Sequence, residues 1–276
     1  MPTIREALRG AADRFRAAGV PDAANDAALL LSHVTGEPQL NLRADAGREL
    51  SADVTAAFEA LVDRRAAREP LQYITGEAWF MGLRLRCAPG VLIPRFDTET
   101  LCQEALRRMR GRERVLDLCT GSGALACAIG HAFPAARVFA GDISEAALSL
   151  ARENAARCGV QAEFRLGDLF APFAGELFDL IVSNPPYIPA KALSALQAEV
   201  RREPSLALDG GADGLDFYRR IAAEAPDHLP RGGWLLMEIG SGQAEDVTAL
   251  LRPDFRDIEV YRDLNGLDRT VAGRRK

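Results

Sequence analysis

Apolar residues recur at helical spacing through the first part of the chain. In the first predicted helix these positions are Ile4, Leu8, Ala12 and Phe15. Gly19-Val20-Pro21 breaks this run, Asp22 can cap a second helix, and Ser51 can cap a third, longer one. No strand-like alternation of apolar and polar residues occurs here. The pattern therefore predicts a small α-helical bundle over residues 1–72.

The pattern changes between residues 73 and 96. Short runs such as Leu83–Arg86 alternate apolar and polar positions, and glycine and proline separate them. Alternation bounded by turn residues predicts a β-hairpin, which would link two domains. Thr98 then opens an amphipathic helix at the start of the second predicted domain, residues 97–276.

Strand and helix patterns alternate from Arg114 to the C-terminus. The predicted strands are Val115–Cys119, Val138–Asp142, Ala162–Leu166, Phe178–Ser183, Trp234–Ile239, Asp257–Tyr261 and Arg269–Ala272. This alternation predicts an α/β domain with an open, mostly parallel sheet that is covered on both faces. The loop around Asn265-Gly266 is too short for a parallel crossover, so the last two strands should pair antiparallel. Seven strands in this layout are typical of a Rossmann-like methyltransferase domain.

Composition and charge restrict the function. The chain has 276 residues, with 34 basic and 39 acidic residues and a net charge of −5. This balance argues against a protein that mainly binds nucleic-acid backbones, but it allows a site for one nucleotide. The five cysteines form no CxxC pair and the three histidines lie far apart in the sequence, so we expect no metal centre. The odd number of cysteines also argues against a disulfide framework, so we expect the protein to reside in the reducing cytoplasm. No signal peptide or membrane span is expected either.

A glycine-rich segment follows the first predicted strand of the sheet. It reads Cys119-Thr120-Gly121-Ser122-Gly123 and leads into a helix. Glycines let a ligand approach the backbone closely, and the start of a helix offers free N–H groups. Alone, the segment would suit NAD or S-adenosyl-L-methionine equally, and it could also be a tight turn without a ligand.

Carboxylates follow the next two predicted strands. Asp142 can accept hydrogen bonds from both hydroxyls of a ribose, which NAD and S-adenosyl-L-methionine both contain. Asp168 can accept a hydrogen bond from an adenine amino group, with Leu169 packing on the ring. Asp168 could equally be a helix cap or a solvated turn residue.

A second motif, Asn184-Pro185-Pro186-Tyr187, follows the fourth predicted strand. Ligands bind at the carboxyl ends of such strands. The two prolines hold the backbone extended and remove two N–H donors, so the carbonyls of Asn184 and Pro185 can face a ligand without competition. The Asn184 side chain adds an acceptor and Tyr187 adds a flat face. The motif suits a planar –NH2 group, in an amide or in an exocyclic amine.

Together these features resemble the peptide chain release factor glutamine methyltransferases (the PrmC/HemK family) over nearly the whole chain. The resemblance rests on Pro70–Gly76, Val91–Glu99, Asn184–Tyr187, Glu203–Leu215, Glu238–Gly240 and Asp263–Arg269. Cys119 replaces a glycine of many relatives, and we interpret it as a packing residue. Phe96 replaces a proline and is a candidate for lining the substrate channel.

The resemblance implies methylation of the side-chain amide of the glutamine in the Gly-Gly-Gln motif of class-1 release factors. It implies S-adenosyl-L-methionine as cofactor, held by Cys119, Thr120, Gly121, Ser122, Gly123, Asp142, Asp168, Leu169 and Asn184. Asn184, Pro185 and Tyr187 would be catalytic, and Pro186 would join them in binding the substrate. We further expect a cytoplasmic monomer whose helical domain docks the release factor, without direct contact to nucleic acid or membrane.

Other functions remain open at this point. A glutamine methyltransferase that acts on a ribosomal protein would share the chemistry and differ only in its substrate. An adenine amino-methyltransferase could share the Asn184–Tyr187 motif, but it would need a basic target-recognition region, and the sequence shows none. A nicotinamide dehydrogenase or a non-catalytic adaptor would have no use for that motif.

Overall fold

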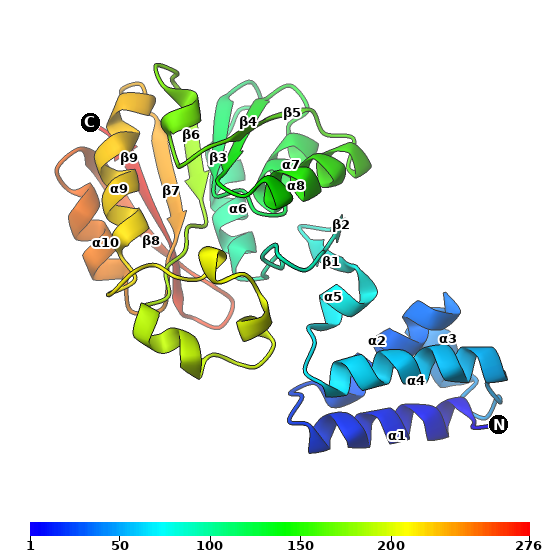
Figure 1. Cartoon of the computed structure of the whole chain (residues 1–276). Helices are drawn as coiled ribbons and strands as arrows, with labels where there is room; N and C mark the ends of the chain where they lie inside the picture. The colour runs from blue at the N-terminus through cyan, green and yellow to red at the C-terminus, as the bar shows by residue number, and fades with distance from the viewer. The chain divides into compact units, whose positions relative to one another are not determined.

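The computed structural model describes residues 1–276, which divide into two compact units (Figure 1). The first unit comprises Met1–Gly76 and Gln197–Arg202, and the second comprises Glu77–Leu196 and Glu203–Lys276. A short segment from the middle of the second unit's sequence therefore packs with the N-terminal helices. No helix in either unit is both long and apolar enough to cross a membrane.

The first unit is the predicted helical bundle. Its helices are α1 (Ile4–Ala17), α2 (Ala23–Thr35), α3 (Gln39–Ala44), α4 (Ala52–Ala66) and α5 (Leu71–Thr75), and a short 3-10 turn covers Val200–Arg202. Ser51 caps α4 as predicted, through a hydrogen bond from the Val54 N–H. The prediction that the Asp22 side chain caps α2 is wrong. Its backbone (φ −110°, ψ 50°) lies outside the extended region that turns an N-cap side chain toward the helix.

Buried charges hold the segment Gln197–Arg202 within the first unit. Arg65 is 4% exposed and donates through Nε to Asp26 at 2.8 Å and through Nη1 to Glu199 at 2.8 Å. Arg68 donates to the same Glu199 oxygen at 2.7 Å. Burial alone would raise the pKa of Glu199, but the hydrogen bonds from Arg68 and Arg65 lower it to about 2. Glu199 is therefore ionised at neutral pH and serves as the shared anion of two arginines.

The second unit begins with the predicted β-hairpin. Strands β1 (Glu77–Phe80) and β2 (Leu83–Arg86) pair antiparallel. The connecting residues Met81 and Gly82 both have positive φ, as a tight type I′ turn requires. The side chains of Phe80 and Leu85 are fully buried in the core of this unit.

The seven-stranded sheet of the second unit confirms the predicted fold. Its strands are β3 (Arg114–Leu118), β4 (Arg137–Asp142), β5 (Ala162–Leu166), β6 (Leu180–Ser183), β7 (Trp234–Glu238), β8 (Phe255–Arg262) and β9 (Asp268–Arg275). They lie in the order β5-β4-β3-β6-β7-β9-β8. The first five run parallel, and β9 pairs antiparallel with both β7 and β8, as the short loop between the last two strands predicted.

Helices cover both faces of this sheet (Figure 1). The α-helices are α6 (Thr98–Arg108), α7 (Ala124–Ala132), α8 (Glu145–Arg157), α9 (Asp216–Glu224) and α10 (Ala244–Leu251). The 3-10 turns are Ala171–Phe173, Ala190–Ala195, Ser205–Ala207 and Ala225–His228. Val115 packs into the core beneath α6 and α7, whereas its neighbour Leu116 packs into the core beneath α9 and α10. This alternation explains why the central strands read as nearly continuous apolar runs.

Candidate active site

The register of the sheet brings the two sequence motifs together. Leu118 pairs with Ser183 on one side and with Gly141 on the other. The residues that follow these strand ends, Cys119, Asn184 and Asp142, therefore emerge next to one another. The strand order reverses between β3 and β6, and a crevice for a ligand forms at such a switch point.

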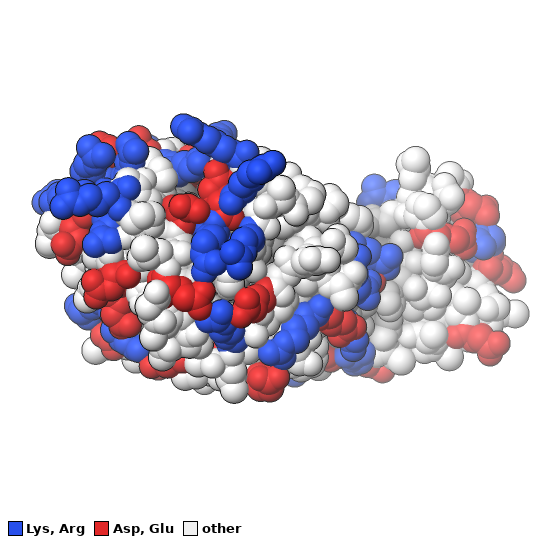
Figure 2. All heavy atoms as spheres, turned by 90° about the horizontal axis from the view of Figure 1, so that it is seen from above, with Lys and Arg blue, Asp and Glu red and all other residues white.

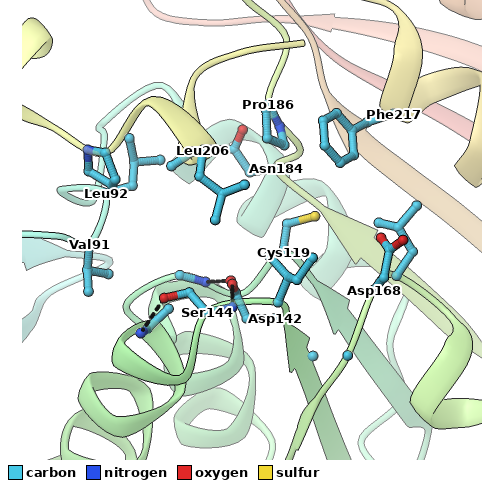
Figure 3. Close-up of a pocket in the computed structure, with 18 of the residues that line it drawn as sticks. Val91, Leu92, Cys119, Asp142, Ser144, Asp168, Asn184, Pro186, Leu206 and Phe217 are labelled. Atoms are coloured by element: carbon cyan, nitrogen blue, oxygen red, sulfur yellow. Dashed lines mark hydrogen bonds between the residues drawn. The ribbon is translucent and has the colours of Figure 1, made fainter. Parts of the chain in front are cut away.

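A cavity opens at this edge of the sheet (Figure 3). The space between its walls, including the open solvent at its mouth, is about 920 Å³. The predicted cofactor residues in its wall are Cys119, Gly121, Asp142, Asp168, Leu169 and Asn184. A smaller cavity of about 380 Å³ shares Cys119, Gly121 and Asn184 with the first. Asn184 therefore stands where two adjoining spaces meet.

Three other residues of the glycine-rich segment have different surroundings. Thr120 and Ser122 line the smaller cavity, but the Thr120 hydroxyl donates to Asp117 at 2.6 Å. Gly123 lines neither cavity. It has φ +78°, and a Cβ there would lie 2.9 Å from the Cβ of Ala151 on α8. Gly123 is therefore needed for the close packing of the loop against α8.

Asp142 is positioned by backbone donors. Its two carboxylate oxygens accept hydrogen bonds from the N–H groups of Gly121 and Ser144, each at 2.9 Å (Figure 3). Burial raises the pKa of Asp142, and these two bonds oppose the rise. Each carboxylate oxygen has a second lone pair, so both can still accept a ligand hydroxyl.

Asp168 also lines the cavity, but its carboxylate already has a partner. Arg220 on α9 donates to it at 2.7 Å, and Arg220 is itself part of the cavity wall. The sequence did not indicate this ion pair. Any hydrogen bond from an adenine amino group to Asp168 would have to coexist with it.

Cys119 adopts a backbone conformation that favours glycine. Its φ is +59°, in the left-handed region, where a Cβ costs roughly 1–2 kcal/mol. Burial raises the pKa of its thiol, so it is not a thiolate nucleophile. The strained backbone explains why glycine is suited to this position, and the role of Cys119 as a packing residue stays an interpretation.

At Cys119, the usual order of stability, in which an alanine variant is more stable than a glycine variant, should be reversed. We expect Cys119→Gly to be more stable than Cys119→Ala by about 1 kcal/mol, because alanine keeps the left-handed strain. Urea unfolding of both variants measures the difference. Cys127, which is buried inside helix α7, is the control: there alanine should be more stable than glycine by about 1 kcal/mol. Equal stabilities of the two Cys119 variants would show that the strain is not present.

The second motif divides between the cavities and the core. Asn184 lines both cavities and Pro186 lines the larger one, whereas Pro185 and Tyr187 belong to the walls of neither. The Tyr187 hydroxyl donates to Glu238 at 3.2 Å, and its ring packs against the core beneath α9 and α10. Stacking of Tyr187 on a substrate amide stays a prediction.

Several residues of the site were not foreseen from the sequence. Thr98, at the start of α6, accepts a hydrogen bond from Asn184 Nδ2 at 3.2 Å and lines the smaller cavity. Leu206 and Phe217 supply apolar walls to the larger cavity (Figure 3). Phe96, a candidate for the substrate channel, is 77% exposed and lines neither cavity. Thr98 lies in the segment Val91–Glu99 and Glu238 in the segment Glu238–Gly240, and both segments carry the family resemblance. That resemblance was the signal in the sequence that could have pointed to these two residues.

Arginines next to the two cavities are paired with acids. Arg220 pairs with Asp168, and Arg95 pairs with Glu203. By contrast, Arg110, Arg112 and Arg231 form no ion pair and line a hollow at the opposite edge, where the strands begin. Figure 2 looks onto that edge and shows basic side chains gathered there with acidic ones among them. These three unpaired arginines therefore lie away from the candidate active site.

Comparisons of the sequence place both parts of the chain among known proteins. The model of the PrmC N-terminal domain matches residues 6–76, and the model of the methyltransferase small domain matches residues 94–203. A release factor glutamine methyltransferase from Geobacter sulfurreducens is 46% identical over 274 residues, covering 99% of this chain and 96% of the relative. One from Moorella thermoacetica is 44% identical over 280 residues, covering 99% of both chains.

Solved structures share the fold of the second unit. The ribosomal protein L11 methylase from Lactobacillus delbrueckii subsp. bulgaricus superposes with a TM-score of 0.52 at 26% identity, over 70% of this chain and 85% of that one. The 16S rRNA N2 G1207 methyltransferase from T. thermophilus, in complex with AdoMet and guanosine, gives a TM-score of 0.54 at 19% identity. The superposition covers 72% of this chain and 50% of that one.

Proposed function

The chain belongs to the release factor glutamine methyltransferase family, and from this premise we propose that it methylates the glutamine side-chain amide in the Gly-Gly-Gln motif of class-1 release factors. S-adenosyl-L-methionine would be the methyl donor. One observation carries the proposal: Asn184 lies at the junction of two cavities with its amide nitrogen already bonded to Thr98. Its Oδ1 is left to accept a hydrogen bond from a substrate N–H.

The larger cavity fits the nucleoside part of the donor. Asp142 offers carboxylate lone pairs to ribose hydroxyls, and Leu169 and Phe217 offer apolar surface to a flat ring. At Gly121 a Cβ would meet no atom within 4 Å, so there is open space directly beside the backbone. These features support Cys119, Gly121, Asp142, Asp168, Leu169 and Asn184 as cofactor-binding residues.

The protein's own part in the chemistry is positioning and hydrogen bonding. When bound, S-adenosyl-L-methionine supplies an electrophilic methyl group on a sulfonium. A glutamine amide nitrogen is a weak nucleophile because its lone pair is delocalised. Asn184 Oδ1 and the Pro185 carbonyl would accept hydrogen bonds from the two N–H groups of this amide. These bonds would stabilise the positive charge that develops on the nitrogen. The product amide keeps one N–H, and the other proton leaves to water.

The charges around the site favour a protein substrate over a nucleic acid. Arg220 and Arg95 are both neutralised by carboxylates, so phosphates approaching the cavities would find no free arginine there. Arg110, Arg112 and Arg231, which form no ion pair, lie at the other end of the sheet, where the strands begin. We therefore expect no direct role for nucleic acid in catalysis.

Mass spectrometry tests the proposed function directly. The purified protein is incubated with S-adenosyl-L-methionine and an unmodified class-1 release factor, and the Gly-Gly-Gln peptide is weighed. We expect one added methyl group on the glutamine, and none when that glutamine is replaced by alanine. A peptide without the methyl group, from protein that still binds S-adenosyl-L-methionine, would contradict the release factor as substrate. A ribosomal protein would then be tested in the same assay.

The remaining features follow from the same proposal. The helical unit, residues 1–72, would contact the body of the release factor, residues 73–96 would act as linker, and residues 97–276 would perform the transfer. We expect the protein to act in the cytoplasm, where release factors work, and to do so as a monomer. Size-exclusion chromatography with light scattering checks the oligomeric state.

A further inference from the structure

A buried carboxylate lies behind Asn184 and has no part in the transfer itself. Glu238 ends strand β7 and is 1% exposed. Its Oε1 accepts a hydrogen bond from the Tyr187 hydroxyl at 3.2 Å, whereas its Oε2 has no hydrogen-bond partner. A buried carboxylate oxygen without a partner is costly, so its presence next to a catalytic motif requires an explanation.

Thr98 connects this carboxylate to Asn184. The Thr98 Oγ1 accepts a hydrogen bond from Asn184 Nδ2 at 3.2 Å. The Thr98 hydroxyl also lies close enough to Glu238 to lower the pKa of that carboxyl group. A hydroxyl has one proton to donate, and an ionised carboxylate can only accept. Because Asn184 Nδ2 already donates to Thr98 Oγ1, the Thr98 proton points away from Asn184, and an ionised Glu238 attracts it although the two groups form no hydrogen bond in the structure.

This arrangement distinguishes the two ends of the Asn184 carboxamide. Lone pairs on Thr98 accept only from the –NH2 end, so Nδ2 points toward Thr98 and Oδ1 points into the cavities. Rotating the carboxamide by half a turn would bring Oδ1 against the same lone pairs and present an N–H donor to the substrate. Such a donor would repel the N–H groups of a substrate amide.

We propose that Glu238 is a positioning residue that acts through Thr98 to hold the Asn184 carboxamide with Oδ1 facing the substrate. The inference rests on the proposed function, because only an –NH2 substrate needs an acceptor at this point. It adds Glu238 and Thr98 to the residues on which turnover depends, although neither would touch the reacting atoms. Asn184, Thr98 and Glu238 come from three different elements: the end of β6, the start of α6 and the end of β7.

The charge state of Glu238 is set by groups on several elements. Burial raises the pKa of Glu238 to about 7; Thr98, Arg269 on β9 and Tyr187 oppose the rise, and Asp97 adds to it. On α9, Tyr218 donates its hydroxyl to the Glu238 backbone carbonyl at 3.0 Å. Glu238 therefore gains its charge as pH rises through about 7, and the preferred orientation of Asn184 should strengthen over the same range.

The first experiment compares four variants in the release factor assay. Glu238→Gln can donate an N–H to Thr98, so the Thr98 proton turns toward Asn184 and favours the wrong orientation. We expect Glu238→Gln and Thr98→Val to lower kcat by roughly 10- to 100-fold, with KM and S-adenosyl-L-methionine affinity nearly unchanged. Thr98→Ser keeps the hydroxyl and should retain most of the activity. Thr248→Val is the control and should leave kcat unchanged, because Thr248 lies on α10 and lines neither cavity.

A second substitution at Asn184 isolates orientation from other effects. Asn184→Asp gives this side chain two equivalent oxygens, so it no longer has a wrong orientation. In the Asn184→Asp background, Glu238→Gln should therefore cause no further loss of kcat, and the two substitutions should be strongly non-additive. Additive losses would overturn the proposal, since they would mean that Glu238 acts independently of Asn184.

A spectroscopic measurement needs no substrate and tests the influence of Glu238 on Asn184 through Thr98, which we call the relay. The side-chain –NH2 resonances of Asn184, assigned by their absence in Asn184→Ala, should titrate near pH 7 in the wild type. They should lose this titration in Glu238→Gln and in Thr98→Val. Resonances that are the same in all three proteins would overturn the relay even if methylation is found. A wild type that shows the titration but methylates no glutamine would instead contradict the proposed function.

Discussion

Replacing Asn184 with alanine is expected to lower kcat for glutamine methylation by about 100- to 1,000-fold. The variant loses the Oδ1 acceptor at the junction of the two cavities, where the substrate amide would develop positive charge. Its affinity for S-adenosyl-L-methionine should change by less than about tenfold, because a single neutral hydrogen bond contributes only about 0.5–1.5 kcal/mol. Single-turnover kinetics and calorimetric titration of the donor measure the two quantities separately.

The Asn184→Asp variant is the control for this prediction. It keeps an oxygen acceptor in a side chain of the same shape, so it should retain more activity than Asn184→Ala. Equal losses of turnover and donor affinity in Asn184→Ala would assign the residue to cofactor binding alone. An alanine variant as active as the wild type would remove Asn184 from the catalytic residues.

Replacing Arg65 with methionine should destabilise the helical unit by roughly 3–5 kcal/mol. Arg65 is buried between Asp26 and Glu199, and its loss leaves the buried Asp26 carboxylate without its partner. Hydrogen exchange followed by mass spectrometry on the full chain should show faster exchange in α2 and α4, while β3 and β6 remain protected. The segment Gln197–Arg202 should also exchange faster, since it loses one of its two arginine contacts.

Arg64 offers a matched control for the Arg65 prediction. It is the neighbouring residue on the same helix, but its ion pair with Glu69 is on the surface, with 43% of the arginine side chain exposed. Arg64→Met should therefore cost only about 0–1 kcal/mol. Adding Asp26→Leu to Arg65→Met should restore much of the lost stability, because it removes the stranded carboxylate. Equal effects of Arg64→Met and Arg65→Met would contradict a buried charge cluster.

Local patterns in the sequence were sufficient to predict most of the secondary structure. The alternation of apolar runs with helical patterns predicted all seven strands of the sheet, and the short loop at Asn265-Gly266 predicted the antiparallel pairing of β8 and β9. The cap at Ser51 was also predicted correctly. These features depend on residues a few positions apart, so periodicity and turn chemistry suffice to reveal them. Asp22 was misjudged because capping also depends on the backbone conformation at that residue.

The candidate site was predicted in outline for a related reason. Parallel strands present their carboxyl ends at one edge of the sheet, so residues that follow β3, β4 and β6 had to converge there. Asp142 and Asn184 could therefore be assigned to one site from their positions alone. Sequence position cannot show what a side chain already contacts, and the pairing of Asp168 with Arg220 on α9 was not foreseen.

The sequence by itself determined the element order, the two motifs and the family of this protein, because each depends on residues that are neighbours along the chain. The tertiary structure alone decided which distant side chains meet. Asn184 contacts Thr98 across 86 residues, Tyr187 contacts Glu238 across 51, and Glu199 contacts Arg65 across 134. Such contacts arise from the packing of whole elements around a shared core, and no local periodicity encodes them. Thr98 and Glu238 therefore became candidates for positioning Asn184 only in the folded chain.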